Sequence, residues 1–199
     1  MPQFPINLNV SGKRVLVVGG RRIALRKTEQ LVECGADVTV VAPDIVPELS
    51  SLNVACIRRE FHISDLESVW LVITATGNNV VDQRIFDEAT RRRIWVNSAD
   101  DPERCSFTLP AVLRRGDLMI TSSTAGSSPA LSSYIRNFLT QAFVDDWHLI
   151  VDELAEHRRD IHARGESTED VDWQPIISGV LDKYPHVTEA LGLKSKAPL

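Results

Sequence analysis

The sequence predicts an α/β fold built around a parallel β-sheet. Lys13–Val18 and Asp37–Ala42 are short valine-rich runs bounded by glycine or proline, as strands buried on both faces are. Between them, Ile23–Cys34 consists of helix-forming residues with apolar positions at helical spacing, and Gly35 is a plausible end for that helix. The three segments form one β-α-β unit.

The same alternation continues along the first half of the chain. Val54–Ile57 and Val69–Thr76 are predicted as the third and fourth strands, and Ile94–Asn97 as the fifth. Asp82–Arg93 is predicted as a helix with a charged outer face. Strands alternating with helices indicate a parallel sheet covered on both faces, of the Rossmann type with strand order 3-2-1-4-5.

The pattern changes after about residue 105. Phe107–Leu113 and Leu118–Ser123 predict a β-hairpin turning at Arg114–Asp117. Ser128 then suits an N-cap for a helix over Pro129–Phe143. This helix has an apolar stripe that suits either core packing or a dimer interface, and it consists of Leu131, Tyr134, Ile135, Phe138, Leu139 and Ala142.

The last part of the chain is predicted to be helical. Helices are expected over Trp147–His162 and Trp173–Tyr184, on either side of the polar loop Gly165–Asp172. We therefore divide the chain into a Rossmann domain over residues 1–112, a dimerisation hairpin and helix over residues 113–145, and a small C-terminal helical domain over residues 146–199.

Composition narrows the function classes. The formal net charge of −5 argues against a general nucleic-acid binder but leaves room for a local basic pocket. Cys34, Cys56 and Cys105 are far apart, which argues against a disulfide framework or a zinc cluster and favours a reducing compartment. Neither a signal peptide nor a membrane span is recognisable, so we expect a cytoplasmic protein that does not bind membranes.

Gly19–Ala24 (GGRRIA) lies where a phosphate-binding turn belongs, after a strand and at the start of a helix. Gly19 permits a tight turn, and the small Ala24 lets helix and strand pack closely. The middle glycine of a GxGxxA pattern is replaced by Arg21, which could crowd a dinucleotide or pair with one of its phosphates. A Rossmann domain without a nucleotide is the alternative.

The end of the second strand does not decide between NAD and NADP. An acidic residue normally stands there to bind the adenosine ribose. Here Ala42 and Pro43 end the strand, and Asp44 comes two residues late.

Two further segments have polar groups at predicted ligand-binding edges. Asn97–Pro102 follows the fifth strand, and its adjacent Asp100 and Asp101 could act as bases, bind metal, or form a turn before the proline. Thr121–Ser128 is a hydroxyl-rich loop before a helix, which suits an anion such as a carboxylate or a capped helix start. The histidines do not form a recognisable hydrolytic triad.

Together these pieces resemble the precorrin-2 dehydrogenase/sirohydrochlorin ferrochelatase family, which includes the N-terminal half of bifunctional sirohaem synthases. The resemblance follows the chain in order through VLVVGG…IALRK at Val15–Lys27, GADVTVVAP at Gly35–Pro43 and ITAT with Asn78. Its most specific part is N-x-x-D-x-P at Asn97–Pro102, followed by SF, PA and the TAGSSPAL segment at Thr124–Leu131 with Arg136.

The resemblance implies oxidation of precorrin-2 to sirohydrochlorin with NAD as cofactor, in sirohaem biosynthesis. Some members also insert ferrous iron, and the family is homodimeric through the hairpin and the helix after it. It implies Asp100 as the catalytic base and no metal ligated by the protein. The cofactor residues it implies are Gly19, Gly20, Arg21, Arg22, Ile23, Ala42, Pro43, Thr76 and Asn78. The residues it implies for the tetrapyrrole are Asn97, Thr124, Ser127, Ser128 and Arg136.

The chain departs from the family pattern at two positions of the expected cofactor site. Arg21 stands where relatives commonly have glycine, and Asn78 where an acidic residue is frequent. A chelatase or tetrapyrrole-binding relative that has lost its dinucleotide is therefore the second hypothesis. A nucleotide-sensing regulatory domain is the third, but it would have no use for Asp100 and Ser128.

Overall fold

The computed structural model describes residues 3–99 and 101–192 of the chain, so the predicted base Asp100 lies outside the described residues. The chain forms two compact units, Met1–Thr108 and Leu109–Leu199. The finer predicted division at residues 112 and 145 stays a prediction.

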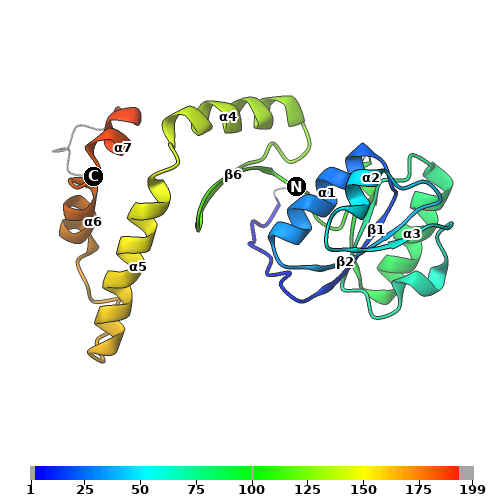
Figure 1. Cartoon of the computed structure of the whole chain (residues 1–199), viewed down its shortest axis with the longest axis horizontal. Helices are drawn as coiled ribbons and strands as arrows, with labels where there is room; N and C mark the ends of the chain where they lie inside the picture. The colour runs from blue at the N-terminus through cyan, green and yellow to red at the C-terminus, as the bar shows by residue number, and fades with distance from the viewer. Residues whose placement is uncertain (1–2, 100, 193–199) are drawn as a thin grey trace. The chain divides into compact units, whose positions relative to one another are not determined.

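The first unit is a five-stranded parallel sheet in the order β3-β2-β1-β4-β5, which confirms the predicted fold class and strand order. Figure 1 shows this sheet between helices. Its strands are β1 (Arg14–Val18), β2 (Asp37–Val41), β3 (Ala55–Ile57), β4 (Leu71–Thr74) and β5 (Trp95–Ser98).

Each face of the sheet has its own apolar core, because neighbouring residues of a strand point to opposite faces. Val15 and Val17 of β1 pack with Ala24 of α1 (Arg22–Glu33) on one face, where the short α2 (Pro47–Ser50) also lies. On the other face, side chains of the sheet pack against α3 (Asn79–Arg92) and the 3₁₀ turn η1 (Ile63–Leu66). These layers hold the carboxyl ends of all five strands at one edge.

The second unit is a hairpin followed by helices. β6 (Ala111–Arg115) and β7 (Leu118–Ser122) pair antiparallel. The Arg115 side chain joins the hairpin to the end of α4, because its Nε donates to the Phe143 carbonyl at 2.7 Å. The helices are α4 (Pro129–Ala142), α5 (Trp147–Ala163), α6 (Trp173–Leu181) and α7 (Pro185–Ala190).

Several predicted boundaries were wrong for local reasons. α3 begins at Asn79 and not at Asp82, because the Asn78 side chain caps it. The hairpin turn is only Gly116-Asp117, since Arg114 and Arg115 pair within the ladder with Met119 and Leu118. Four short elements were not predicted, namely α2, η1, α7 and the 3₁₀ turn η2 (Pro102–Arg104).

The first hairpin strand begins at Ala111, and Phe107 is not part of it. The Phe107 carbonyl instead accepts a hydrogen bond from the Asn97 side chain, at 2.9 Å. Ser106 likewise donates its backbone N–H to the Val96 carbonyl at 2.8 Å. The segment before the hairpin is therefore bonded to β5 and not to β7.

Candidate dinucleotide site

The turn between β1 and α1 is fixed by close backbone packing on both sides. Gly19 has φ +130, and a Cβ there would lie 2.3 Å from the Ala75 carbonyl oxygen at the end of β4. A Cβ on Gly20 would lie 2.0 Å from the Asp44 carbonyl oxygen in the loop after β2. Only glycine fits either position. The turn therefore lies between the ends of β2 and β4, the two strands that flank β1.

The first turn of α1 is open to an anion. Within the described residues, no side chain caps this helix, and its first turn has no acidic residue. The backbone N–H groups of a first turn have no acceptor inside the helix and carry the positive end of its dipole. The predicted residues Arg22 and Ile23 are exposed here, at the place where a pyrophosphate is bound in dinucleotide folds. The residues present therefore fit a dinucleotide.

Arg21 directly precedes this open turn. Its backbone is extended, with φ −104 and ψ −167, a conformation that any residue adopts. Its exposed side chain lines a cavity of about 380 Å³ together with Pro43 and Asp44 of the loop after β2. Ala42, the other predicted residue of that loop, is buried. The arginine is therefore beside the ends of β1 and β2.

The segment after β4 is held by a polar cluster at the start of α3. Asn78 accepts from the Val80 N–H at 3.0 Å. Thr76 donates from Oγ1 to Oδ1 of Asp82 at 2.7 Å, and Asp82 is only 7% exposed. Thr76 and Asn78, both predicted for the cofactor, thus also hold the start of α3. Sequence reasoning missed the role of Asp82 because it predicted this residue as the first of a helix with a charged outer face.

Asn97 holds the loop after β5 to the strand, together with Cys105 and Ser106. Its side chain is buried and donates to the Phe107 carbonyl. The Cys105 sulfur accepts from the Ser98 N–H at 3.2 Å, and burial raises the pKa of the Cys105 thiol. Asn97 therefore holds Cys105 and Phe107 to the carboxyl end of β5.

Asp101 is engaged structurally in that loop. Its carboxylate caps η2 by accepting from the Glu103 N–H at 2.9 Å, and it lies 3.5 Å from Nε of Arg104. Arg104 also donates to Gln83 of α3 at 2.9 Å. The sequence analysis gave a turn before Pro102 as one alternative for this segment, and Asp101 forms such a turn.

The loop before α4 lies in the second unit and is closed by its own hydroxyl groups. Ser128 caps α4 by accepting from the Leu131 N–H at 3.3 Å, and its own N–H donates to Oγ1 of Thr124 at 2.9 Å. Ser127 is exposed. Arg136, about two turns into α4, has a buried Nε without a hydrogen-bond partner in the described part of the chain. This loop and the dinucleotide turn belong to different units.

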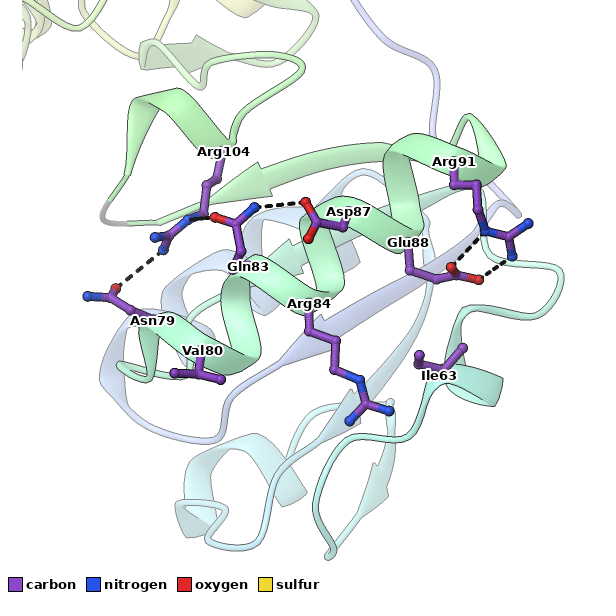
Figure 2. Close-up of a pocket in the computed structure, with 9 residues that line it drawn as sticks. All are labelled: Ile63, Asn79, Val80, Gln83, Arg84, Asp87, Glu88, Arg91 and Arg104. Atoms are coloured by element: carbon purple, nitrogen blue, oxygen red, sulfur yellow. Dashed lines mark hydrogen bonds and ion pairs between the residues drawn. The ribbon is translucent and has the colours of Figure 1, made fainter.

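A larger hollow of about 650 Å³ follows the outer face of α3 (Figure 2). Its polar groups mostly bond to one another. Glu88 pairs with Arg91, and Gln83 donates to Asp87 at 2.8 Å. Arg84 is exposed and makes no hydrogen bond or ion pair among the residues described. The hollow has no group of side chains converging on one point, so we assign it no ligand.

The residues that the structure describes contain neither a metal site nor a membrane-spanning helix. In that part of the chain no group of three histidine, cysteine or acidic side chains could hold a metal ion. No described helix is both long enough and apolar enough to cross a bilayer.

The open turn at the start of α1 lies within a segment that matches a known protein family. Residues 6–111 match the family model described as putative NAD(P)-binding. The chain belongs to this NAD(P)-binding family. The match confirms NAD as the predicted cofactor, and its description covers NADP as well.

Curated relatives match about two thirds of the chain. Siroheme synthase 1 of Aeromonas hydrophila is 40% identical over 141 residues, covering 68% of this chain and 30% of the relative. Siroheme synthase of Acinetobacter baylyi is 43% identical over 142 residues, covering 68% and 31%. The chain thus spans about a third of the length of these relatives.

A solved structure matches nearly the whole chain. It is titled SirC, precorrin-2 dehydrogenase, and is 26% identical with a TM-score of 0.73. The match covers 96% of this chain and 98% of that one. Together with the siroheme synthases, it confirms the family resemblance predicted from the sequence.

Two side chains of the NAD(P)-binding unit were not found from the sequence. Lys27 lies in α1, where the sequence analysis gave its amino group no role. Burial lowers the pKa of its amino group, which also interacts with Cys105. Arg58, just after β3, lines the cavity beside Arg21. Arg58 stands in no recognisable motif, and Lys27 ends the IALRK segment without a role being assigned to its amino group; only the packing of separate elements reveals their surroundings.

Proposed function

We propose that this chain is a precorrin-2 dehydrogenase of sirohaem biosynthesis, which oxidises precorrin-2 to sirohydrochlorin with NAD. The observation that carries the proposal is the match to SirC, precorrin-2 dehydrogenase, over 96% of this chain and 98% of that one. The uncapped start of α1, in a unit that matches an NAD(P)-binding family, supports it independently.

The reaction removes a hydride and a proton from the tetrapyrrole. When bound, the nicotinamide of NAD accepts the hydride. The protein must then hold the two reactants and accept the proton. The Gly19–Gly20 turn and the first turn of α1 would bind the pyrophosphate, and a base at the carboxyl edge of β5 would take the proton.

Asp100 is our proposed base. Its neighbour Asp101 already caps η2 and lies beside Arg104, so the Asp101 carboxylate has a structural role. Hydrogen bonds hold Ser106 and Phe107 to Val96 and Asn97 of β5. This division of roles favours Asp100, the aspartate that matches the family motif, over Asp101.

We propose that the tetrapyrrole carboxylates bind at Thr124, Ser127, Ser128 and Arg136, with Asn97 near the reacting ring. The buried, unpartnered Nε of Arg136 supports this, since a buried donor without an acceptor is costly unless a ligand supplies one.

We also propose a homodimer formed through the hairpin and α4. The stripe on α4 leaves Leu131 48%, Tyr134 69% and Phe138 62% exposed in this chain. Large apolar side chains grouped on one helix face mark association surfaces. Light scattering should give twice the 22.2 kDa chain mass, and Tyr134→Glu with Phe138→Glu should return the monomer. A monomeric wild-type chain at micromolar concentration would exclude this dimer.

The experiment for the proposed activity supplies precorrin-2 and NAD without oxygen and follows NADH formation by its absorbance. We expect turnover by the wild type and a loss on the order of a hundredfold in Asp100→Asn, the usual contribution of a general base. Asp101→Asn is the matched control and should keep most of its turnover. Absence of NADH formation by the wild type would overturn the proposal.

The second candidate is a chelatase that inserts ferrous iron into sirohydrochlorin without a dinucleotide. The observation favouring it is Arg21 in place of the middle glycine. Iron insertion displaces pyrrole protons, so the same base would serve. Sirohaem formation from sirohydrochlorin and ferrous iron, in a chain that binds no NAD by calorimetry, would establish this candidate in place of the dehydrogenase.

A further inference from the structure

The cavity beside Arg21 lies at the carboxyl ends of three neighbouring strands. It opens between the turn after β1, the loop after β2 and the residue after β3. In doubly wound folds the adenosine half of a dinucleotide lies at this side of the phosphate turn. The cavity measures about 380 Å³ and is lined by Arg21, Pro43, Asp44, Ile45, Val46 and Arg58.

Two guanidinium groups line this cavity without an acidic partner. The Arg21 side chain makes no hydrogen bond or ion pair with any described residue. Arg58 donates from Nη2 to Oγ of Ser50 at 3.1 Å, which engages one of its five N–H donors. The single acidic lining residue, Asp44, forms no ion pair with either arginine in the described structure. Two cations therefore remain available to a ligand.

The end of β2 has no charge that would repel a phosphate. An acidic residue there binds the ribose 2′-hydroxyl of NAD, whereas a nearby arginine accommodates the 2′-phosphate of NADP. In this chain Val41 and Ala42 are buried and apolar, and Pro43 follows. The nearest carboxylate is that of Asp44, further along the loop, and it lines the same cavity.

We propose that this cavity is a 2′-phosphate subsite in which Arg21 and Arg58 bind the phosphate, so that the chain binds NADP at least as tightly as NAD. The proposal rests on the proposed dinucleotide function and adds a specificity that neither the family description nor the relatives assign. Arginine suits this task because its planar fork matches phosphate oxygens and stays charged.

The test compares matched nucleotides by calorimetry on the full chain. Adenosine 2′,5′-bisphosphate should bind about tenfold more tightly than 5′-AMP, a difference of about 1.4 kcal/mol. Arg58→Ala should remove most of that difference while changing 5′-AMP affinity less than twofold. The 3′,5′ isomer should bind like 5′-AMP, because general attraction of anions would not distinguish the position of the phosphate.

Arg84→Ala is the control for net charge, because Arg84 is exposed on α3 and unpaired among the described residues (Figure 2). It should leave all affinities unchanged. Arg58→Gln repeats the test with a polar side chain if the alanine variant unfolds. Equal affinities for the 2′,5′ and 5′ nucleotides, or equal losses in Arg58 and Arg84 variants, would overturn the subsite. Wild-type chain that binds NAD but not NADP would overturn only this proposal, whereas binding of neither would also overturn the dehydrogenase.

Discussion

The starts of α1 and α4 follow similar glycine-containing loops but differ in how their first turns are satisfied. At α4, Ser128 caps the helix and Pro129 stands at its first position. At α1, no described side chain caps the helix, and the preceding residue is Arg21. A side-chain cap satisfies one of the first-turn N–H groups, whereas an uncapped turn offers all of them to an anion. The comparison separates a capped helix start, which we call structural, from an open one that we propose to bind the pyrophosphate.

Gly20→Ala should have the largest effect on the binding helix start. The new Cβ would lie 2.0 Å from the Asp44 carbonyl oxygen, so the loop after β2 must shift. Overpacking of this kind costs about 2 kcal/mol of stability. We expect dehydrogenation to fall on the order of a hundredfold, since a displacement of about 1 Å is enough to cause such a loss.

The control for Gly20→Ala is Gly179→Ala in α6. There a Cβ would meet no atom within 4 Å, and φ is not positive. Chemical denaturation should show a gain of about 0.5–1 kcal/mol, as for alanine in place of glycine inside a helix. Equal behaviour of the two variants would contradict the close packing described for the turn.

Arg21→Gly should have the next largest effect, and its sign distinguishes the two hypotheses for this residue. If the arginine binds a 2′-phosphate, the change should weaken NADP binding about tenfold, or about 1.4 kcal/mol, with a smaller loss for NAD. If it excludes the cofactor sterically, NAD binding should tighten by a similar factor. Calorimetry with both dinucleotides measures this, and no change in either would refute both accounts.

Sequence reasoning found the five strands and the two long helices of the first unit because the strands are continuous apolar runs, and strand order follows from their alternation with helices. It missed the short α2, η1 and η2. It placed the glycine turn correctly because Gly19 and Gly20 directly follow β1. It missed Asp82 and Arg58, whose roles come from elements that meet only in the folded chain. It offered the Ser128 loop as an anion site, a cap or both; the structure shows the cap, and the anion site stays a prediction.

Ser128→Ala tests the structural helix start. Loss of the bond from the Leu131 N–H should lower the free energy of unfolding by about 1 kcal/mol, the usual value of an N-cap. Ser127→Ala is the neighbouring stability control, because its exposed side chain forms no hydrogen bond among the described residues. Equal destabilisation by both changes, measured by chemical denaturation, would show that the cap contributes nothing.

Arg22→Glu should have the smallest effect on stability. It should raise stability while it weakens dinucleotide binding, as expected for an open helix start that binds an anion. It introduces a carboxylate into the uncapped first turn of α1, where the helix dipole favours negative charge. Stability should rise by about 0.5 kcal/mol. Dinucleotide binding should weaken, because the new charge competes with the pyrophosphate for the same N–H groups.

Arg22→Gln removes the positive charge without adding a negative one, so the difference between the two variants isolates the competition. A carboxylate that raised stability without weakening NAD binding would mean that the first turn of α1 does not hold the pyrophosphate.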